Sequence, residues 1–396
     1  MSKTELLQAL PEELILELTK QMVAIPTPNP PGQEKACADF ILQQFEQWGI
    51  ETESIPQPDP ERPQVVAWIR GSGEGPTVIL NGHMDTVGIG EMQDWHVEPF
   101  SVTEKEGRLY GRGTCDMKGS LAIAMVILKT LKDSGVQFPG TLMFQAVIGE
   151  EMDEDGTRTL LKLGYTGDYA IVLEPTDLRI GPGTRGVAWH RVTLHGPSIH
   201  CGLAHVDSSD LIYRFGQLLE MFEAYHREVA SKKHHLIPSP SCRITDLKAG
   251  GIHNDIAGRC EFVVDRRMVP GETYEQITEE LRQILDRFVE AYSDFSYQLE
   301  FLVGNEPTET ALDHPLIETL KANVESVGER KAEIWGPPYG CDMRNFVADA
   351  NIPTTNFGAG DYRVCHKPNE FVERSDLMTC ARIVMGTTVD LLNQLT

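Results

Sequence analysis

Apolar and polar positions follow two patterns along the first part of the chain, one typical of strands and one typical of helices. Short apolar runs bounded by turn residues predict strands, most of them buried on both faces, at residues 64–70, 77–81, 141–148 and 169–173. Apolar positions at helical spacing predict helices at residues 6–22, 34–48 and 117–131. The last of these helices is apolar almost all round, as expected beneath a sheet. Strands that alternate with helices predict an α/β sheet with helices on both faces.

The pattern changes near residue 181, in a stretch rich in glycine. Residues 187–194 alternate apolar with polar side chains, as in a strand with one exposed face. The elements predicted after it are a helix at 207–225, strands at 242–247 and 259–266, and a helix at 274–292. This order is typical of a β-α-β-β-α-β sandwich of the ferredoxin-like type.

Beyond residue 301 the alternation of buried strands and helices seen before residue 181 returns. It predicts a helix from Pro315, an apolar strand at 353–357 and a closing helix at 374–394. We therefore predict a mixed-sheet α/β domain made of residues 1–184 and 301–396, interrupted by an inserted α+β domain at 185–300. One continuous large domain is the alternative interpretation.

The composition of the chain limits which kinds of molecule it could bind. Against 35 Lys and Arg, the chain has 59 Asp and Glu, so its formal net charge is -24. Such a surface repels nucleic acids and anionic membranes, which bind cationic faces. No apolar stretch reaches the roughly 20 residues that a bilayer requires, and the first residues read as an amphipathic helix, so we expect no secretory signal there. The eight cysteines contain no Cys-x-x-Cys pair, which favours free thiols and a cytoplasmic protein.

Acidic and imidazole side chains follow the predicted buried strands. His83 and Asp85 come after the strand at 77–81, Glu150 and Glu151 close the strand at 141–148, and Glu174 ends the next one. In open α/β sheets the carboxyl ends of the strands form the functional edge. Since unpaired buried charge is costly, the clustering favours a site for bound cations.

Two of these motifs have a simpler interpretation when each is taken alone. His83 and Asp85 could form an exposed pair, or Asp85 could orient the ring of a metal-binding His83. Asp116, which lies between Gly113 and Gly119, could cap a helix. It could instead bridge two cations, which lie about 3.5–4 Å apart in such sites.

The doublet Glu150 and Glu151 could divide two tasks, one carboxylate binding metal and the other acting as a base. The acidic residues at 153–155 keep a solvated loop as the alternative. His366 lies in a loop after a Gly-Ala-Gly turn and means little alone. Together, the set supplies two cations with a bridging Asp, one His each and one Glu each. Such ligation suits zinc, and cobalt or manganese also fit.

The stretches Gly-His-Met-Asp-Thr-Val and Gly-Arg-Gly-Thr-Cys-Asp-Met-Lys-Gly, followed by Glu-Glu and Glu-Pro-Thr, carry a resemblance. Over nearly its whole length, the chain is similar to a zinc-dependent family of aminoacylases, deacetylases, desuccinylases and carboxypeptidases. That family includes acetylornithine deacetylase and succinyl-diaminopimelate desuccinylase. The resemblance implies that His83 and Glu174 hold one metal. Glu151 and His366 would hold the other, with Asp116 bridging.

The same resemblance implies roles for residues outside the metal set. Glu150 would be the general base, and Asp85 would orient His83. The inserted domain would serve as a dimerisation domain and lid, with His200 reaching the partner subunit's site to stabilise the oxyanion. His195 and His205 lie close in sequence, so the identity of the functional histidine stays open.

Three further residues match family positions near the substrate: Asn254, Arg267 and Arg344. The two arginines could clamp a substrate carboxylate or form ordinary ion pairs. A family Gly-x-Ser-Asp pattern is replaced here by Gly-Cys-Asp at 340–342, which alters how a substrate would be seated.

The function we expect is hydrolysis of the amide bond in a small N-acyl amino acid, as in deacylases for acetylornithine or succinyl-diaminopimelate. Two metals would activate a water, and Glu150 would move its proton to the leaving amine. A dipeptidase or carboxypeptidase with the same metals is the alternative. A non-catalytic scaffold would require a broken ligand set, and a nucleophile at Cys115 or Cys365 is formally open. We expect a homodimer.

Overall fold

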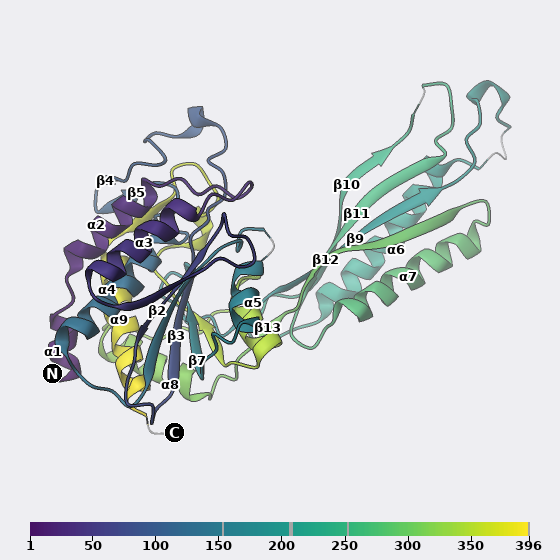
Figure 1. Cartoon of the computed structure of the whole chain (residues 1–396). Coiled ribbons are helices and arrows are strands. Elements are labelled where there is room, and N and C mark those ends of the chain that lie inside the picture. Colours follow the sequence, from purple (N-terminus) through teal and green to yellow (C-terminus); the bar gives the residue numbers. More distant parts are fainter. Residues whose placement is uncertain (153, 206–208, 252, 395–396) are drawn as a thin grey trace. The chain divides into compact units, whose positions relative to one another are not determined.

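The computed structural model describes residues 1–152, 154–205, 209–251 and 253–394. The chain forms two compact units (Figure 1). The first comprises Met1–Gly183, Thr310–Trp335 and Cys341–Thr396, and the second comprises Thr184–Glu309 and Gly336–Gly340. The second unit is therefore inserted into the chain of the first, and the predicted α/β class with an inserted α+β part is confirmed.

A six-stranded mixed sheet organises the first unit, in the order β1-β2-β6-β3-β7-β14. Its strands are β1 (Glu51–Ile55), β2 (Gln64–Ile69), β3 (Thr77–His83), β6 (Thr141–Val147), β7 (Tyr169–Val172) and β14 (Thr354–Asn356). The strands β6, β3, β7 and β14 run parallel, whereas β1 and β2 are antiparallel to their neighbours. The carboxyl ends of the parallel strands consequently meet at one edge of the sheet.

The helices of this unit are α1 (Lys3–Gln8), α2 (Glu12–Val23), α3 (Lys35–Gln47), α4 (Lys118–Ser134), α5 (Asp155–Lys162), α8 (Pro315–Ser326) and α9 (Arg374–Leu392). Helices α4 and α9 pack against β3 and β6 (Figure 1). Leu80 and Phe144 belong to the core on that side. On the other side, Asn81 Nδ2 donates to Thr157 Oγ1 of α5 at 3.0 Å. No helix in the described parts of the chain is long and apolar enough to cross a bilayer.

The single helix predicted over residues 6–22 is wrong, because the structure has two helices there. Helix α1 ends at Gln8, and α2 begins at Glu12 after Pro11. Proline has no N–H to donate and disfavours helical geometry in the residue before it, Leu10. The apolar spacing continues across the break, which is why the pattern alone suggested one helix.

The described residues form two smaller sheets as well. The strands β4 (Thr103–Lys105), β5 (Arg108–Tyr110) and β15 (Phe371–Glu373) form an antiparallel sheet in the order β15-β5-β4. It sets the segment after His366 beside the segment that leads to Asp116. The strands β8 (Gly183–Thr184) and β13 (Thr308–Glu309) pair with each other. Short helical turns in the described parts of the chain are η1 (Met92–Asp94), η2 (Cys201–Leu203), η3 (Asn345–Asp349) and η4 (Tyr362–Val364).

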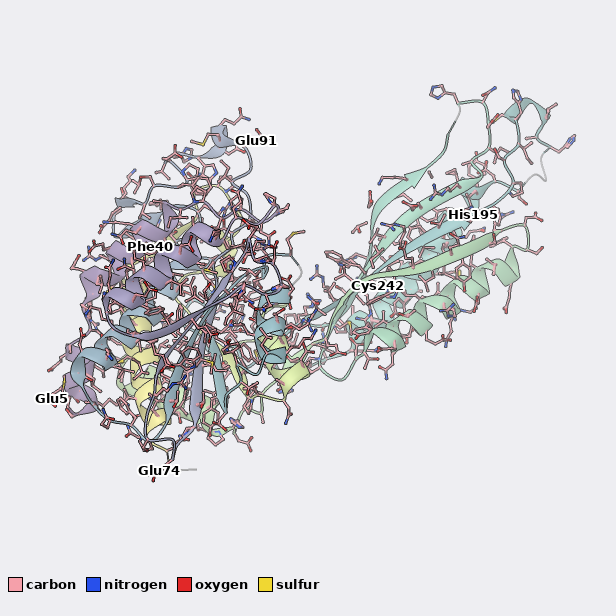
Figure 2. The ribbon with its side chains drawn as sticks, viewed as in Figure 1. Glu5, Phe40, Glu74, Glu91, His195 and Cys242 are labelled. Carbon is pink, nitrogen blue, oxygen red and sulfur yellow. The ribbon has the colours of Figure 1, made fainter. Side chains whose placement is uncertain are left out.

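The second unit is a four-stranded antiparallel sheet in the order β10-β11-β9-β12. Its elements are β9 (Gly186–His195), α6 (Leu211–Ser231), β10 (Ser241–Ala249), β11 (Arg259–Met268), α7 (Tyr274–Ala291) and β12 (Ser296–Asn305). The helices pack on one face, in a core that contains Val192, Leu218 and Phe262. His195 and Cys242 lie at opposite ends of the sheet (Figure 2).

The element order of the second unit is the predicted β-α-β-β-α-β. The helix predicted over 207–225 begins at Leu211 in the described part, where the Asp210 carboxylate caps it by accepting from the Ile212 N–H at 2.9 Å. Residues 207 and 208 of that prediction lie outside the described residues. The helix continues to Ser231, beyond the predicted end.

Candidate metal centre

Three parallel strands deliver side chains to one edge of the sheet in the first unit. His83 is the last residue of β3, Glu150 and Glu151 follow β6, and Glu174 follows β7. Because these strands end together, the side chains converge as the sequence predicted. His83 is 1% exposed and Glu174 is 5% exposed, so the charges lie largely out of water.

Asp116 enters the same edge from the turn between β5 and α4. The turn and the first turn of α4 each need a glycine. Gly113 has a φ of +87°, which side chains rarely adopt. A Cβ on Gly119 would lie 2.4 Å from the Thr114 carbonyl oxygen. The glycines of the motif thus let the chain fold back closely enough to direct Asp116 towards the strand ends.

Asp116 lies between two imidazoles, and each of its carboxylate oxygens faces a different one. Its Oδ1 is 3.0 Å from Nε2 of His83, and its Oδ2 is 3.2 Å from Nε2 of His366. Two groups of potential ligands share it, one formed with His83 and Glu174 and the other with Glu151 and His366. Within each group the ligand atoms lie within 4.8 Å of one another. The geometry can accommodate two cations, one on each side of the Asp116 carboxylate.

The carboxylates around Asp116 are short of positive partners. Burial and the charge of Glu174 raise the pKa of Glu150 well above its usual range. Burial and the charge of Asp116 do the same for the pKa of Glu174. Oε1 of Glu174 is buried and makes no hydrogen bond within the described chain. Two divalent cations would relieve this excess of negative charge, so the donor set fits them.

The carboxylates in turn raise the pKa of the imidazoles. Hydrogen bonds from His366 to Asp116 and Glu151 raise the pKa of His366 to about 10. Burial alone would raise the pKa of Asp116, but the adjacent His366 and His83 hold it below its usual range. Oε2 of Glu151 lies 3.0 Å from His366 Nε2, and its Oε1 accepts the Val87 N–H at 3.2 Å.

The orientation of His83 differs in one detail from the sequence interpretation, which assigned it to the carboxylate of Asp85. Nδ1 of His83 lies 2.8 Å from the main-chain carbonyl oxygen of Asp85, whereas the carboxylate Oδ1 is 3.7 Å away. The carboxylate instead accepts from Asn29 Nδ2 at 2.9 Å and from the Glu151 N–H at 3.2 Å. Asp85 therefore orients the ring through its backbone and the Glu151 segment through its side chain.

One residue of this centre was missed by the sequence interpretation. The carboxylate of Glu370 is fully buried and accepts hydrogen bonds from the backbone of the turn that presents Asp116. Its signal in the sequence is weak, an acidic residue just before the strand at 371–373. Nothing in that pattern reveals that its partners lie some 250 positions earlier, among Gly113, Cys115 and Asp116.

In the second unit the structure brings two of the predicted residues together. His200 Nδ1 accepts the Gly202 N–H at 3.1 Å. Its Nε2 lies 2.9 Å from Nδ2 of Asn254. Backbone hydrogen bonds from Cys201 to Asn254 and from Ile256 to Ile199 hold the two segments side by side.

The two predicted substrate arginines are engaged by carboxylates. Arg267 forms a fork with Asp265 at 2.8 and 3.0 Å. Arg344 belongs to the first unit, is 4% exposed and donates from Nε to Glu154 at 2.6 Å. Both arrangements match the ion-pair interpretation that the sequence left open.

The described cysteines are all free thiols, as expected. The Sγ atoms of Cys115 and Cys365 lie 3.6 Å apart. The Cys365 thiol lowers the pKa of Cys115, but burial and nearby carboxylates outweigh it and raise that pKa to about 11. A thiolate nucleophile is therefore disfavoured at Cys115.

A third group of potential ligands, His234, His235 and Glu309, lies in the second unit. Nδ1 of His234 accepts backbone N–H groups of Leu236 and Ile237 at 3.3 and 3.1 Å, so its Nε2 carries the proton. That Nε2 lies 3.3 Å from Glu309 Oε2. With Nδ1 engaged by the backbone and the proton on Nε2, this ring offers no lone pair to a cation.

Comparison with known proteins gives the same picture. A family model described as peptidase family M20/M25/M40 matches residues 79–389. An N-formyl-4-amino-5-aminomethyl-2-methylpyrimidine deformylase from Halalkalibacterium halodurans is 29% identical, with 94% of this chain and 93% of the relative covered. A probable succinyl-diaminopimelate desuccinylase from Staphylococcus aureus is 25% identical, with 91% and 93% covered.

Among solved structures, a dinuclear metal binding peptidase of the M20 family from Bacillus subtilis superposes with a TM-score of 0.75. It is 18% identical, and the match covers 97% of this chain and 99% of that one, which shows the shared fold. The resemblance inferred from the sequence motifs is confirmed. The chain belongs to peptidase family M20/M25/M40 and is a hydrolytic enzyme.

Proposed function

We propose that this hydrolase uses two divalent metal ions to remove the acyl group from a small N-acyl amine or N-acyl amino acid. The observation that carries the proposal is Asp116, a buried carboxylate whose two oxygens each face a different histidine. The relatives named for deformylation and desuccinylation cleave acyl groups from amines, and they cover over nine tenths of this chain. That likeness favours an acyl amide over a peptide.

In this proposal His83 and Glu174 hold one cation, Glu151 and His366 hold the other, and Asp116 bridges them. Imidazole nitrogen with carboxylate oxygen is a donor set that zinc favours and that cobalt and manganese accept. The buried Glu174 Oε1, without a hydrogen bond among the described residues, fits a ligand atom. When bound, the cations supply Lewis acidity that polarises an amide carbonyl and acidifies water.

Glu150 is the proposed general base. It belongs to neither ligand group among the described residues, although its Oε2 lies 3.9 Å from His83 Nε2. Its carboxylate would take a proton from the attacking water as oxygen adds to the amide carbon. It would then deliver that proton to the departing nitrogen as the C–N bond breaks, which yields a carboxylic acid and an amine. Burial, which raises its pKa, strengthens it as a base.

The inserted unit, at 185–300 in the predicted division, would act as a dimerisation domain and lid. We propose that the ring of His200 stabilises the developing oxyanion in the partner subunit's site, with Asn254 beside it. A role for Arg267 and Arg344 in binding a substrate carboxylate stays a prediction.

The test is a substrate panel at fixed zinc concentration, comparing formyl-, acetyl- and succinyl-amino acids with dipeptides. We expect one acyl class to exceed all dipeptides in kcat/KM by at least about tenfold, which corresponds to about 1.4 kcal/mol. Exhaustive chelation should abolish that activity, and zinc, cobalt or manganese should restore it. Faster dipeptide cleavage would favour the peptidase alternative, which the family description supports. Activity that survives chelation would overturn the metal proposal.

A further inference from the structure

Glu370 connects two segments that lie far apart in the sequence. It follows His366 by four positions, yet its carboxylate contacts the turn that carries Asp116. Its Oε1 accepts three backbone N–H groups, from Gly113 at 2.9 Å, Cys115 at 3.0 Å and Asp116 at 3.1 Å. Converging N–H groups of this kind form a concavity that favours an anion.

The same residue holds the start of the turn. Oε2 of Glu370 accepts from Arg112 Nη1, and Arg112 Nη2 donates to the Gly88 carbonyl at 3.1 Å. The Glu370 backbone carbonyl accepts the Gly111 N–H at 2.9 Å. Glu370 is fully buried and Arg112 is 1% exposed, so water cannot readily replace these contacts. The turn from Gly111 to Asp116 is therefore fastened along most of its length to one residue, through its side chain and its backbone carbonyl.

The segment on the other side needs such an anchor. His366 and Asn369 both have a φ of +61°, a left-handed conformation that costs free energy for a residue other than glycine. Asn369 is fixed by accepting the His96 N–H at 2.7 Å and donating to the Asp94 carbonyl at 2.9 Å. Strained backbone persists where neighbouring contacts over-determine it, and Asn369 and Glu370 supply those contacts.

We propose that Glu370 is the positioning residue of the metal pair. By fastening the Asp116 turn to the His366 segment, it fixes the distance between the shared carboxylate and the second histidine, 3.2 Å from Oδ2 to Nε2. The inference rests on the proposed function, because it concerns the spacing of the same ligands. Residues that orient ligands typically change metal affinity or activity by about 10- to 100-fold when they are altered.

The test is the variant Glu370→Gln, titrated with cobalt(II) and followed by visible absorption. Glutamine retains an oxygen for the backbone N–H groups but sets an NH2 group against Arg112, so the anchor is weakened. We expect cobalt affinity to fall about 10- to 100-fold and the absorption bands of the bound ion to shift, because the ligand geometry changes.

A matched control is Glu34→Gln, another fully buried carboxylate that accepts two hydrogen bonds from an arginine, Arg62, at 2.8 and 2.6 Å. Both hydrogen bonds go to Arg62 and neither reaches the Asp116 turn, so we expect the cobalt affinity and spectrum of the wild type. Loss of affinity in both variants to the same extent would show a general effect of removing a buried ion pair, and would overturn a specific role for Glu370.

If Glu370→Gln does not fold, Arg112→Lys carries the test, since lysine keeps the charge and removes the planar fork. Either variant, folded and with wild-type cobalt affinity and spectrum, overturns the inference. A measurement on the wild type alone also bears on it, because the N–H groups of Gly113, Cys115 and Asp116 should exchange slowly with solvent. Fast exchange there contradicts the inference. A wild-type protein that binds no cobalt would instead overturn the proposed function.

Discussion

Glu150 and Glu151 are neighbours in the sequence, yet their carboxylates have different surroundings. Glu151 is tied on both oxygens, to the Val87 N–H and to His366. For Glu150, the contact found among the described residues is a 3.9 Å approach to His83, and its pKa is raised by burial and by Glu174. A ligand gains from a fixed position, whereas a base needs a free oxygen and a proton affinity near the working pH.

The variant Glu150→Gln should therefore separate catalysis from metal binding. We expect kcat to fall by about 10²- to 10⁴-fold, the usual contribution of a general base, with two metal ions still bound. Metal content is measured by atomic spectroscopy on the same sample. The matched control is Glu151→Gln, which should lose metal as well as activity. Loss of metal from Glu150→Gln would mean that the two roles are reversed.

At this scale the sequence could predict most of the residues that converge, because His83, Glu151 and Glu174 follow buried parallel strands and Asp116 lies in a glycine-rich turn. His366 has no such signal and was identified through the family resemblance. The sequence could not predict which atom of Asp85 meets His83, since a backbone carbonyl carries no residue signature. Nor could it predict Glu370, whose partners are backbone N–H groups and would accept any carboxylate that the fold delivers. Contacts to the main chain leave little trace in the sequence.

Strand β9 carries His190, a buried histidine whose protonation links the stability of the second unit to pH. The Thr278 hydroxyl donates to the Tyr274 carbonyl at 2.7 Å, so it accepts from His190 Nε2, also at 2.7 Å. Nδ1 of His190 is buried and has no partner among the described residues. Protonation would place a charge there without an acceptor, and burial accordingly lowers the pKa of His190 to about 4.

From this we predict that the second unit loses stability as the pH falls from 6.5 to about 4. The folded state binds the proton less readily than the unfolded state, so the stabilisation is complete above the unfolded pKa and lost below it. The expected loss is on the order of 2 kcal/mol, allowing for partial screening by solvent. Hydrogen exchange of the β9 amides, corrected for intrinsic rates, measures it. The variant His190→Gln should lack this dependence, and an unchanged dependence would contradict the assignment.

Most helices and strands could be predicted from the positions of apolar residues. The same criterion explains why the break between α1 and α2 was missed. Burial on both faces made the strands at 77–81 and 141–148 recognisable from apolar composition alone. The same criterion extended one helix across Pro11, because the apolar spacing of α1 and α2 happens to be continuous. Periodicity reports which face is buried, and local backbone chemistry decides where an element ends.

The whole chain carries a formal charge of -24, and part of that excess is concentrated at the buried strand ends of the first unit. Asp116, Glu150, Glu151 and Glu174 share two imidazoles there, and three of these carboxyls have raised pKa values because of burial and mutual repulsion. Without cations this arrangement opposes folding of the first unit. The second unit has no comparable excess among its described residues that the proposed cations would relieve.

Metal binding should therefore stabilise the two units unequally. At a free zinc concentration about 1,000 times the dissociation constant, the folded first unit should gain about 4 kcal/mol. Calorimetry should show its unfolding transition rise by roughly 8–16 °C, at about 2–4 °C per kcal/mol. Hydrogen exchange assigns each transition, through the amides of β3 for the first unit and of β11 for the second. In Asp116→Ala, which removes the shared ligand, the rise should largely disappear. Equal rises in both units would mean that zinc acts elsewhere than on the converging carboxylates, because only the first unit contains them.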